Sequence, residues 1–351
     1  MKEAPFDLSK ITEPLLKWYT ENARILPWRQ TKDPYAIWIS EIMLQQTRVN
    51  AVIEYYHRFM SALPDVKALA EASEETVLKL WEGLGYYSRA RNLQKAAQVI
   101  LKEYGGNIPQ NPELLRALPG IGEYTAGAIA SEAFDLPTPA VDGNVLRIIT
   151  RLTGDFSDIT NGSFKKQVTA RLAEIYPPYR CSDFTQSLME LGAVVCVPNG
   201  MPDCGRCPLA ELCRAKRDDL ISQLPVKQPK KQRQIQERSV FLITDGVKIG
   251  IRKRPEKGLL ASMWELPGAE AFLREREIQT FLKEVGISTL SVEPLCRAKH
   301  IFTHIEWHMQ GYQVICSSCS DSLIWATPDD LTEKFPLPSA FRPFLKRQHS
   351  K

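Results

Sequence analysis

The spacing of apolar residues changes once along this 351-residue chain, and the change limits the folds that it can adopt. From about residue 5 to about residue 224, apolar residues recur every three or four positions, which is typical of amphipathic helices. After Ser239 the period becomes two, which indicates strands, with a helical stretch between the second and third of them. The expected strands are 239–244, 247–253 and 305–316, and the expected helix is 272–285. The pattern therefore predicts a mostly α N-terminal region followed by a smaller α/β domain.

A polar and basic stretch separates the two patterns. Residues 226–238 read VKQPKKQRQIQER, with five basic residues and one acidic residue. Because such a stretch has almost nothing apolar to bury, we expect a solvated linker, and its charge also suits a position near phosphates. The expected organisation is a helical domain at 1–225, a linker at 226–238 and a second domain at 239–351, which suits a length of roughly 150 residues per domain.

The overall charge and the N-terminal sequence bear on partners and compartment. The 45 lysines and arginines exceed the 41 aspartates and glutamates by four, which neither predicts nor excludes a nucleic-acid partner. No apolar run approaches the ~18 residues of a membrane span, and no secretory signal is expected because the first ten residues lack an apolar core. We therefore expect a reducing cytosol, in which the eight cysteines do not form structural disulfides.

Four of the cysteines are clustered with the spacing C-x7-C-x2-C-x5-C, namely Cys196, Cys204, Cys207 and Cys213. Within 196–213, short loops allow four thiolates to converge on one metal centre. Four cysteines suit tetrahedral zinc as well as a [4Fe-4S] cluster. The spacing alone leaves both possibilities open.

A Gly-x-Gly turn lies between two expected helices, at 112–117 and 124–133. Gly120 and Gly122 permit close backbone approach, and the second helix offers free N–H groups at its start. This combination favours an anion site that suits a DNA phosphate, although an ordinary tight turn has the same pattern.

Glu41 lies in a predicted helix at 34–44, where Ile37, Trp38 and Leu44 are its neighbours on one face. A carboxyl group on an apolar face is expected to have a raised pKa, since burial disfavours the charged form. It would then donate a proton near neutral pH. A structural glutamate in a salt bridge is the equally weighted alternative.

Asp142 precedes another predicted helix, which contains Val145, Leu146 and Ile149. As its N-cap, Asp142 would accept hydrogen bonds from free N–H groups, and these bonds are expected to lower its pKa. One protonated and one ionised carboxyl group form the usual pair for cleaving a glycosidic bond through a cationic sugar.

Several motifs follow one family's pattern in the same order along essentially the whole chain. Together they resemble the helix-hairpin-helix DNA glycosylases of the endonuclease III superfamily, and within it the MutY-type adenine DNA glycosylases. The motifs are Pro27-Trp28-Arg29, Ser40 to Thr47 (SEIMLQQT), Gly83 to Leu93 (GLGYYSRARNL), Leu118 to Gly122 (LPGIG), Val141 to Asn144 (VDGN), Met189 to Ala193 (MELGA) and the four-cysteine loop. Gly258 to Pro267 in the second domain is similar to the family's Nudix-like module that reads 8-oxoguanine.

The resemblance implies that the substrate is adenine opposite 8-oxoguanine or guanine in duplex DNA, flipped out of the helix and excised as the free base. By similarity, Glu41 protonates adenine at N7, Asp142 stabilises the sugar cation, Asn144 orients the site and Tyr124 contacts the reacting nucleotide. The resemblance also selects a [4Fe-4S] cluster for the four cysteines, and it implies a monomer in the cytoplasm, associated with the nucleoid.

Further residues match family positions that contact DNA. Gln46 and Tyr86 match residues that wedge into the duplex beside 8-oxoguanine, and Thr303 carries a hydroxyl group near that base. The full set of expected DNA contacts is Arg29, Gln46, Thr47, Tyr86, Gly120, Gly122, Thr303 and His304.

Tyr124 distinguishes this chain from bifunctional relatives, which carry a lysine nucleophile two residues after the second hairpin glycine. No lysine lies between Lys102 and Lys165, so we expect a monofunctional glycosylase. The alternatives are a pyrimidine glycosylase/lyase of the same superfamily, which Tyr124 and the added domain disfavour, and a non-catalytic iron–sulfur protein that senses damage. The presence of both Glu41 and Asp142 argues against the latter.

The chain departs from the family pattern in the first cysteine interval, which is one residue longer than usual. Phe302-Thr303-His304 replaces Phe-Ser-His, and Ala261-Ser262-Met263 replaces Ala-Gly-Leu. The second domain also lacks the Arg-Glu-x2-Glu-Glu metal box of Nudix hydrolases, so nucleotide hydrolysis is not expected there.

Overall fold

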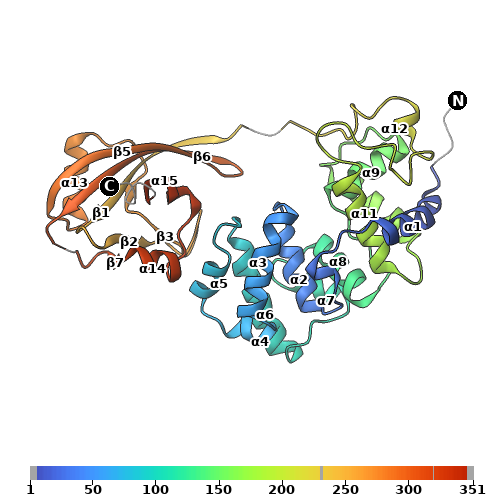
Figure 1. The fold of residues 1–351 in the computed structure, drawn as a ribbon, viewed down its shortest axis with the longest axis horizontal. Helices are drawn as coiled ribbons and strands as arrows, with labels where there is room; N and C mark the ends of the chain where they lie inside the picture. The colour runs from blue at the N-terminus through green and yellow to red at the C-terminus, as the bar shows by residue number, and fades with distance from the viewer. Residues whose placement is uncertain (1–5, 230–231, 319, 346–351) are drawn as a thin grey trace. The chain divides into compact units, whose positions relative to one another are not determined.

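The computed structural model describes residues 6–229, 232–318 and 320–345, and its chain divides into two compact units (Figure 1). The first unit consists of Met1–Glu71 and Asn92–Pro229, and the second consists of Ala72–Arg91 and Lys230–Lys351. The predicted fold class is confirmed, because the first unit is helical and the second contains a mixed sheet with helices. No helix among the described residues has the length and apolar character that crossing a membrane requires.

The first unit contains a set of helices that pack around buried apolar residues. Two short 3₁₀ helices, η1 (Leu8–Ile11) and η2 (Pro27–Arg29), accompany its α-helices. The α-helices are α1 (Thr12–Asn22), α2 (Pro34–Leu44), α3 (Val49–Ala62), α4 (Val66–Glu71), α6 (Ser88–Tyr104, which begins in the second unit), α7 (Pro112–Ala117), α8 (Glu123–Phe134), α9 (Gly143–Thr153), α10 (Gly162–Ala173), α11 (Cys181–Val194) and α12 (Arg214–Arg217).

Side-chain caps fix where the functional helices begin. Asp33 accepts a hydrogen bond from the backbone N–H of Tyr35, and α2 then starts at Pro34, a residue that favours the first helical position. Asn111 caps α7 in the same way. The predicted helices at 34–44 and 112–117 are confirmed with these bounds. The local sequence is therefore sufficient to place both helices.

Four helices of this unit, α2, α8, α9 and α11, are buried along most of their length. Helix α2 packs against α8, and α11 packs against both α8 and α9. Polar side chains on these helices therefore lie inside the unit, where burial changes their protonation and makes each hydrogen bond more consequential.

The second unit is built on a seven-stranded sheet, counted over the described residues, with the main strand order β3-β2-β1-β6-β5. Strand β1 runs parallel to β6 and pairs antiparallel with β2, whereas β5 and β6 form a long antiparallel hairpin (Figure 1). The strands are β1 (Gln234–Thr244), β2 (Ile249–Lys253), β3 (Trp264–Glu265), β4 (Gly268–Ala269), β5 (Thr289–Ile301), β6 (Ile305–Cys316) and β7 (Ile324–Ala326). The helices are α5 (Glu74–Leu80), α13 (Glu275–Glu284), α14 (Pro328–Glu333), η3 (Ser339–Phe341) and α15 (Arg342–Leu345).

Both faces of this sheet are covered. Along β1, Phe241 packs with Ile278 and Leu282 of α13, whereas Leu242 belongs to a separate apolar cluster that contains Phe344 of α15. Successive side chains of a strand point to opposite faces of the sheet. Alternate apolar residues of β1 therefore pack into two separate apolar clusters, one on each face.

The structure corrects two strand predictions. Strand β1 begins at Gln234, within the expected linker, because its polar first residues pair with β6 from Ile305 onward. The linker at 226–238 is therefore shorter than predicted, and residues 230 and 231 lie outside the described part. Strand β5 was not predicted, since Pro294 and two register shifts interrupt its alternation.

The Ala72–Arg91 segment is tied to the rest of the second unit by polar contacts. The Lys79 ammonium donates to the backbone carbonyls of Leu331 and Phe335 at 2.9 and 3.3 Å. Arg91 donates to the carbonyl of Ala261 at 2.5 Å. These donors satisfy backbone groups of the C-terminal segment from a part of the chain that lies far away in sequence.

Candidate active site

Glu41 points from α2 into the interior of the first unit and is 3% exposed. Burial raises its pKa from 4.5 to about 7, and the nearby charge of Asp142 adds to this effect. The hydrogen bond from Tyr124 and the positive charge of Arg29 act in the opposite direction. The predicted rise is thus confirmed, and the group exchanges its proton near neutral pH.

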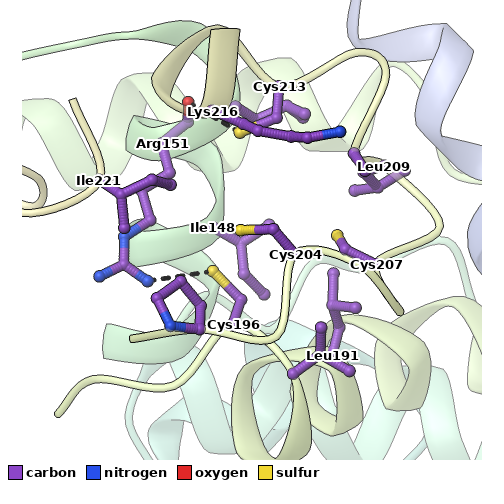
Figure 2. Close-up of a pocket in the computed structure, with 14 residues that line it drawn as sticks. Ile148, Arg151, Leu191, Cys196, Cys204, Cys207, Leu209, Cys213, Lys216 and Ile221 are labelled. Carbon is purple, nitrogen blue, oxygen red and sulfur yellow. Dashed lines mark hydrogen bonds between the residues drawn. The ribbon is translucent and has the colours of Figure 1, made fainter. Parts of the chain in front are cut away.

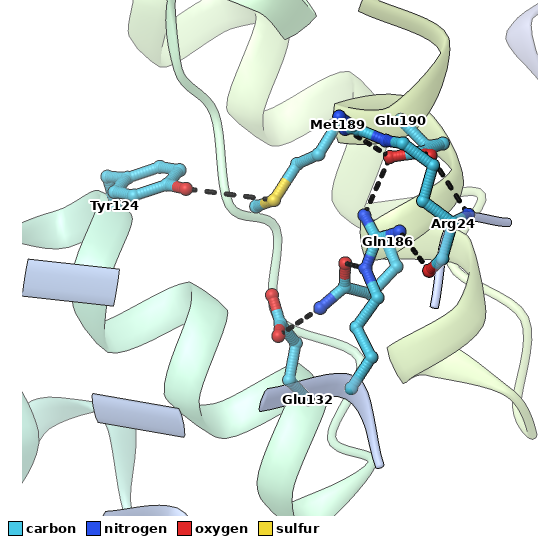
Figure 3. Close-up of polar contacts among 7 residues, drawn as sticks. Arg24, Tyr124, Glu132, Gln186, Met189 and Glu190 are labelled. Carbon is cyan, nitrogen blue, oxygen red and sulfur yellow. Dashed lines mark hydrogen bonds and ion pairs between the residues drawn. The ribbon is translucent and has the colours of Figure 1, made fainter. Parts of the chain in front are cut away.

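Tyr124, in the first turn of α8, is the hydrogen-bond partner of Glu41. Its hydroxyl group donates to Oε2 of Glu41 at 2.8 Å. The sulfur of Met189 lies 3.7 Å from the same hydroxyl oxygen, as Figure 3 shows for Tyr124 and Met189. Burial raises the pKa of Tyr124 well above its usual value. Tyr124 therefore remains a hydrogen-bond donor at the pH values at which Glu41 titrates.

Asp142 caps α9, as the sequence predicts. Its Oδ1 accepts from the backbone N–H groups of Asn144 and Val145, both at 2.8 Å, and its Oδ2 accepts from the Asn144 side chain at 2.7 Å. The expectation that its pKa is lowered is wrong. Burial raises the pKa of Asp142, and the hydrogen bonds and Arg147 offset only part of that effect.

Arg147 connects Asp142 to the cysteine loop through Asn144. Its guanidinium donates to Oδ1 of Asn144 at 2.9 Å, to the carbonyl of Gly192 at 2.8 Å and to the carbonyl of Cys196 at 2.8 Å. A Cβ atom at Gly192 would lie 2.7 Å from Cβ of Asn144, so glycine is required for this close approach. The two hydrogen bonds from Asn144 to Asp142 and the bond from Arg147 together fix the orientation of Asn144.

The four clustered cysteines line one pocket, as Figure 2 shows. Its other walls are mainly apolar, with Ile148, Leu191 and Leu209 among them. The structure therefore brings together all four residues of the predicted metal site.

The charges around this pocket suit an anionic metal group bound by thiolates. Arg151 donates to the sulfur of Cys196 at 3.3 Å, and Lys216 also lines the pocket. Burial raises the pKa of Cys207 to about 12 and also raises the pKa values of Cys204 and Cys213, so these thiols stay protonated unless a metal takes the place of the proton. Over the described ranges, no three His, Cys, Asp or Glu side chains are arranged to hold one metal ion.

Arg29, which stays a predicted DNA contact, has a side chain that is 9% exposed and lies in an internal network. It donates to Oε1 of Gln186 at 2.8 Å and to Oε2 of Glu190 at 2.9 Å. Arg24 forms a two-pronged ion pair with Glu190 at 2.6 and 2.8 Å. The two arginines lower the pKa of Glu190 to about 2, against the effect of burial. Arg29 is therefore part of the interior rather than of the surface.

The hairpin between α7 and α8 has the predicted form. Gly120 has a φ of 76°, and a Cβ atom there would lie 2.7 Å from Cβ of Asn92. Gly122 is the N-cap of α8 and has no side chain that could cap the helix. The first backbone N–H groups of α8 therefore keep their capacity to bind an anion. This arrangement is compatible with a phosphate contact.

The other expected DNA contacts are distributed over both units. Gln46 and Tyr86 both adopt left-handed backbone conformations, with φ values of 58° and 48°, a strained state that is common at functional sites. Thr47 follows Gln46 in the turn after α2. Within the second unit, Thr303 donates to the hydroxyl oxygen of Tyr86 at 3.2 Å, and His304 is the next residue. The structure thus brings Tyr86 and Thr303 together, although they are far apart in sequence.

Glu132 and Gln186 were missed by the sequence analysis. Gln186 donates through Nε2 to Oε2 of Glu132, and Lys32 donates to the backbone carbonyl of Glu132 at 3.1 Å. Burial raises the pKa of Glu132 well above its ordinary value, and Glu41 contributes to the rise. An acidic residue in the small, apolar stretch that follows the first turn of α8 was the available signal.

Comparison with known proteins places this geometry in a defined class. Residues 39–178 match the family described as HhH-GPD superfamily base excision DNA repair protein, and residues 239–347 match the NUDIX domain. The helical unit therefore contains the domain of the HhH-GPD superfamily base excision DNA repair proteins.

Individual relatives refine this assignment. The chain is 35% identical to the adenine DNA glycosylase of Rattus norvegicus, over 88% of this chain and 71% of that protein. It is similar to the solved structure of a thermostable thymine-DNA glycosylase (TM-score 0.53, 29% identity, 60% of this chain and 97% of that one). A structure of a non-covalent endonuclease III–DNA complex is also similar (TM-score 0.51, 25% identity, 60% and 97%). The chain belongs to the adenine DNA glycosylases and is an enzyme of base excision repair.

Proposed function

We propose that this enzyme hydrolyses the N-glycosidic bond of adenine paired with 8-oxoguanine or guanine in duplex DNA. The observation that carries the proposal is the buried Glu41, which is bonded to Tyr124, lies close enough to Asp142 to feel its charge and has a pKa of about 7. An acid with this pKa is protonated in about half of the molecules at neutral pH, and it can transfer its proton to a base placed beside it. Asp142, with three hydrogen bonds, is the group suited to stabilising positive charge.

The reaction starts with adenine flipped out of the duplex, because its glycosidic bond is otherwise inaccessible. Glu41 transfers its proton to N7, and the C1′–N9 bond breaks with its electron pair passing to the base. The deoxyribose is left with an oxocarbenium-like charge that the Asp142 carboxylate stabilises. Water then attacks C1′ and returns a proton to Glu41, which restores the starting state.

Asn144 has a positioning role in this scheme. It holds Asp142 by two bonds, one from its backbone and one from its side chain, while Arg147 fixes the side-chain amide. The Asp142 carboxylate therefore does not have to reorganise when charge develops on the sugar.

We infer that the enzyme is monofunctional. Tyr124 occupies the position that carries the lysine nucleophile in the bifunctional enzymes that this family resembles, and its hydroxyl group is already bonded to Glu41. The closest lysines in sequence are Lys102 and Lys165. Without an amine to form a Schiff base, strand cleavage is expected to be weak or absent.

We assign a [4Fe-4S] cluster to Cys196, Cys204, Cys207 and Cys213. The pocket that all four line, the nearby Arg151 and Lys216, and the family resemblance support this assignment. When bound, the cluster would link both ends of the 196–213 loop. Arg147, which bonds the Cys196 carbonyl, would then hold Asn144 against a fixed loop.

We assign DNA contacts to Gln46 and Thr47 of the first unit, and we assign the recognition of the opposite base to Tyr86, Thr303 and His304 of the second unit. The strained backbones of Gln46 and Tyr86 and the Thr303–Tyr86 hydrogen bond support the assignment. Gly120 and Gly122 would hold a phosphate at the start of α8. We further propose that the enzyme acts as a monomer in the cytoplasm, on the nucleoid.

A single-turnover assay tests this proposal. Duplexes carry adenine opposite 8-oxoguanine or guanine, and the controls carry adenine opposite cytosine or thymine, or thymine opposite guanine. We expect release of free adenine from the first two duplexes, and we expect Glu41→Gln to bind them without releasing the base. Base release by this variant at the parent rate, or release of thymine in preference to adenine, would contradict the proposal.

A further inference from the structure

Glu132 is a buried acid that the reaction above does not use. It lies on α8, is 2% exposed, and accepts a hydrogen bond from Gln186 at Oε2 (Figure 3). Its other oxygen, Oε1, is buried and has no hydrogen-bond partner within the described part of the chain. Buried polar atoms are nearly always paired, so an unpaired one calls for a partner that the free protein lacks.

The directions of the surrounding hydrogen bonds are fixed by Arg29. A guanidinium can only donate, so Oε1 of Gln186 must be the acceptor of its 2.8 Å bond. The amide nitrogen of Gln186 therefore faces Glu132 and donates to Oε2. Bonds to the Arg24 carbonyl and to Glu190 hold Arg29 in place, so this order cannot reverse.

Oε1 of Glu132 is consequently the atom that carries the proton. Burial and the neighbouring Glu41 favour the neutral acid, whereas Arg29, Lys32 and the bond from Gln186 oppose this effect without cancelling it. Glu132 also contributes to the raised pKa values of three tyrosines, none of which supplies positive charge, namely Tyr19, Tyr124 and Tyr176. Because Oε2 accepts from Gln186, the neutral acid has its O–H at Oε1, a donor without an acceptor.

This free donor is directed toward the catalytic groups. Figure 3 shows Oε1 pointing away from Gln186, to the side on which Tyr124 and Met189 lie. Tyr124 is bonded to Glu41, and the charges of Glu41 and Glu132 affect each other. The O–H of Glu132 and the proton of Glu41 therefore lie in the same part of the interior of the first unit.

We propose that Glu132 is a specificity-determining residue whose Oε1–H donates a hydrogen bond to N1 of the flipped-out adenine. The inference rests on the proposed function and adds a contact to the Watson–Crick edge of the base, whereas N7 lies on the Hoogsteen edge. Adenine N1 is an acceptor, whereas guanine and hypoxanthine carry N1–H, which would face the O–H of Glu132 donor to donor. Glu132 would thus favour adenine over these purines inside the pocket.

Two variants and one base analogue test the contact. Glu132→Gln keeps a donor at the Oε1 position, since its carbonyl accepts from Gln186, whereas Glu132→Met fills the same length without a donor. Single-turnover release is compared for adenine and 1-deazaadenine opposite 8-oxoguanine, with 3-deazaadenine as the matched analogue that keeps N1. We expect the parent and Glu132→Gln to release adenine about 10- to 100-fold faster than 1-deazaadenine, and Glu132→Met to lose that difference.

Binding separates this inference from the proposed reaction. The affinity of each protein is measured for duplexes that carry 2′-fluoro-stabilised adenine or 1-deazaadenine, which bind without cleavage. If the parent releases no adenine but binds adenine more tightly than 1-deazaadenine, and Glu132→Met loses that difference, the proposed reaction is refuted and the contact is supported. A parent that releases adenine while Glu132→Met keeps the full preference for N1, in rate and affinity, would refute the contact alone. Equal slowing of both bases by Glu132→Met likewise overturns the proposal, since a purely structural role has that result.

Discussion

Replacing Glu41 by glutamine should stabilise the protein at alkaline pH while abolishing base release. In the folded protein the pKa of Glu41 is about 7, against an ordinary value of 4.5. Since each pKa unit corresponds to 1.36 kcal/mol, ionising this buried group costs the folded state about 3 kcal/mol relative to the unfolded chain.

The sign of this effect follows from which state holds the proton. A raised pKa means that the folded state keeps its proton over a range in which the unfolded chain has already released it. Stability therefore falls as the pH rises from about 4.5 to about 7, and it changes little with this group above that range. Glutamine cannot ionise, so the variant escapes this loss and still accepts a hydrogen bond from Tyr124.

Urea unfolding at pH 5 and pH 8 measures the effect. Glu41→Gln should exceed the parent in free energy of unfolding by about 3 kcal/mol at pH 8 and by less than about 1 kcal/mol at pH 5. The control is Glu54→Gln on the exposed face of α3, which should show no such dependence on pH. An equal difference between parent and Glu41→Gln at both pH values would refute the reasoning.

Three further predictions concern activity. The rate of adenine release should fall as the pH rises through about 7. The hydrogen bond from Tyr124 lowers the pKa of Glu41, so Tyr124→Phe, which removes this bond, should raise that pKa and move the fall in rate to higher pH. An unchanged midpoint in Tyr124→Phe would contradict this. Arg147→Met should slow adenine release about tenfold and hasten the loss of iron absorbance in stored protein, since Asn144 and the Cys196 carbonyl lose a shared donor; parent-like values of both would count against the link. Thr303→Val should reduce the preference for 8-oxoguanine over guanine opposite adenine more than it slows chemistry, and a preserved preference would show that the bond to Tyr86 has no such role.

Local sequence was sufficient where the controlling interactions are local. Asp33 and Asn111 lie within three residues of the N–H groups that they cap, so the starts of α2 and α7 could be predicted. The raised pKa of Glu41 could also be predicted, because the residues that bury it include its own helix neighbours.

Interactions between distant segments were not accessible in this way. The capping bonds of Asp142 are local, but its burial depends on packing between helices, and burial decides the direction of its pKa shift. The internal network of Arg29 was not predicted, because its partners Gln186 and Glu190 lie more than 150 residues away in sequence. Glu132 was missed for the same reason, since its hydrogen-bond donor belongs to α11.

The second unit is assembled from two segments that are not adjacent in sequence, so it cannot be produced in full as one continuous fragment of this chain. A fragment that starts after the linker lacks Lys79 and Arg91, so the carbonyls of Leu331, Phe335 and Ala261 lose their donors. Cutting the linker once leaves the protein joined through α6, and transplanting the sheet into another host would require grafting Ala72–Arg91 along with it.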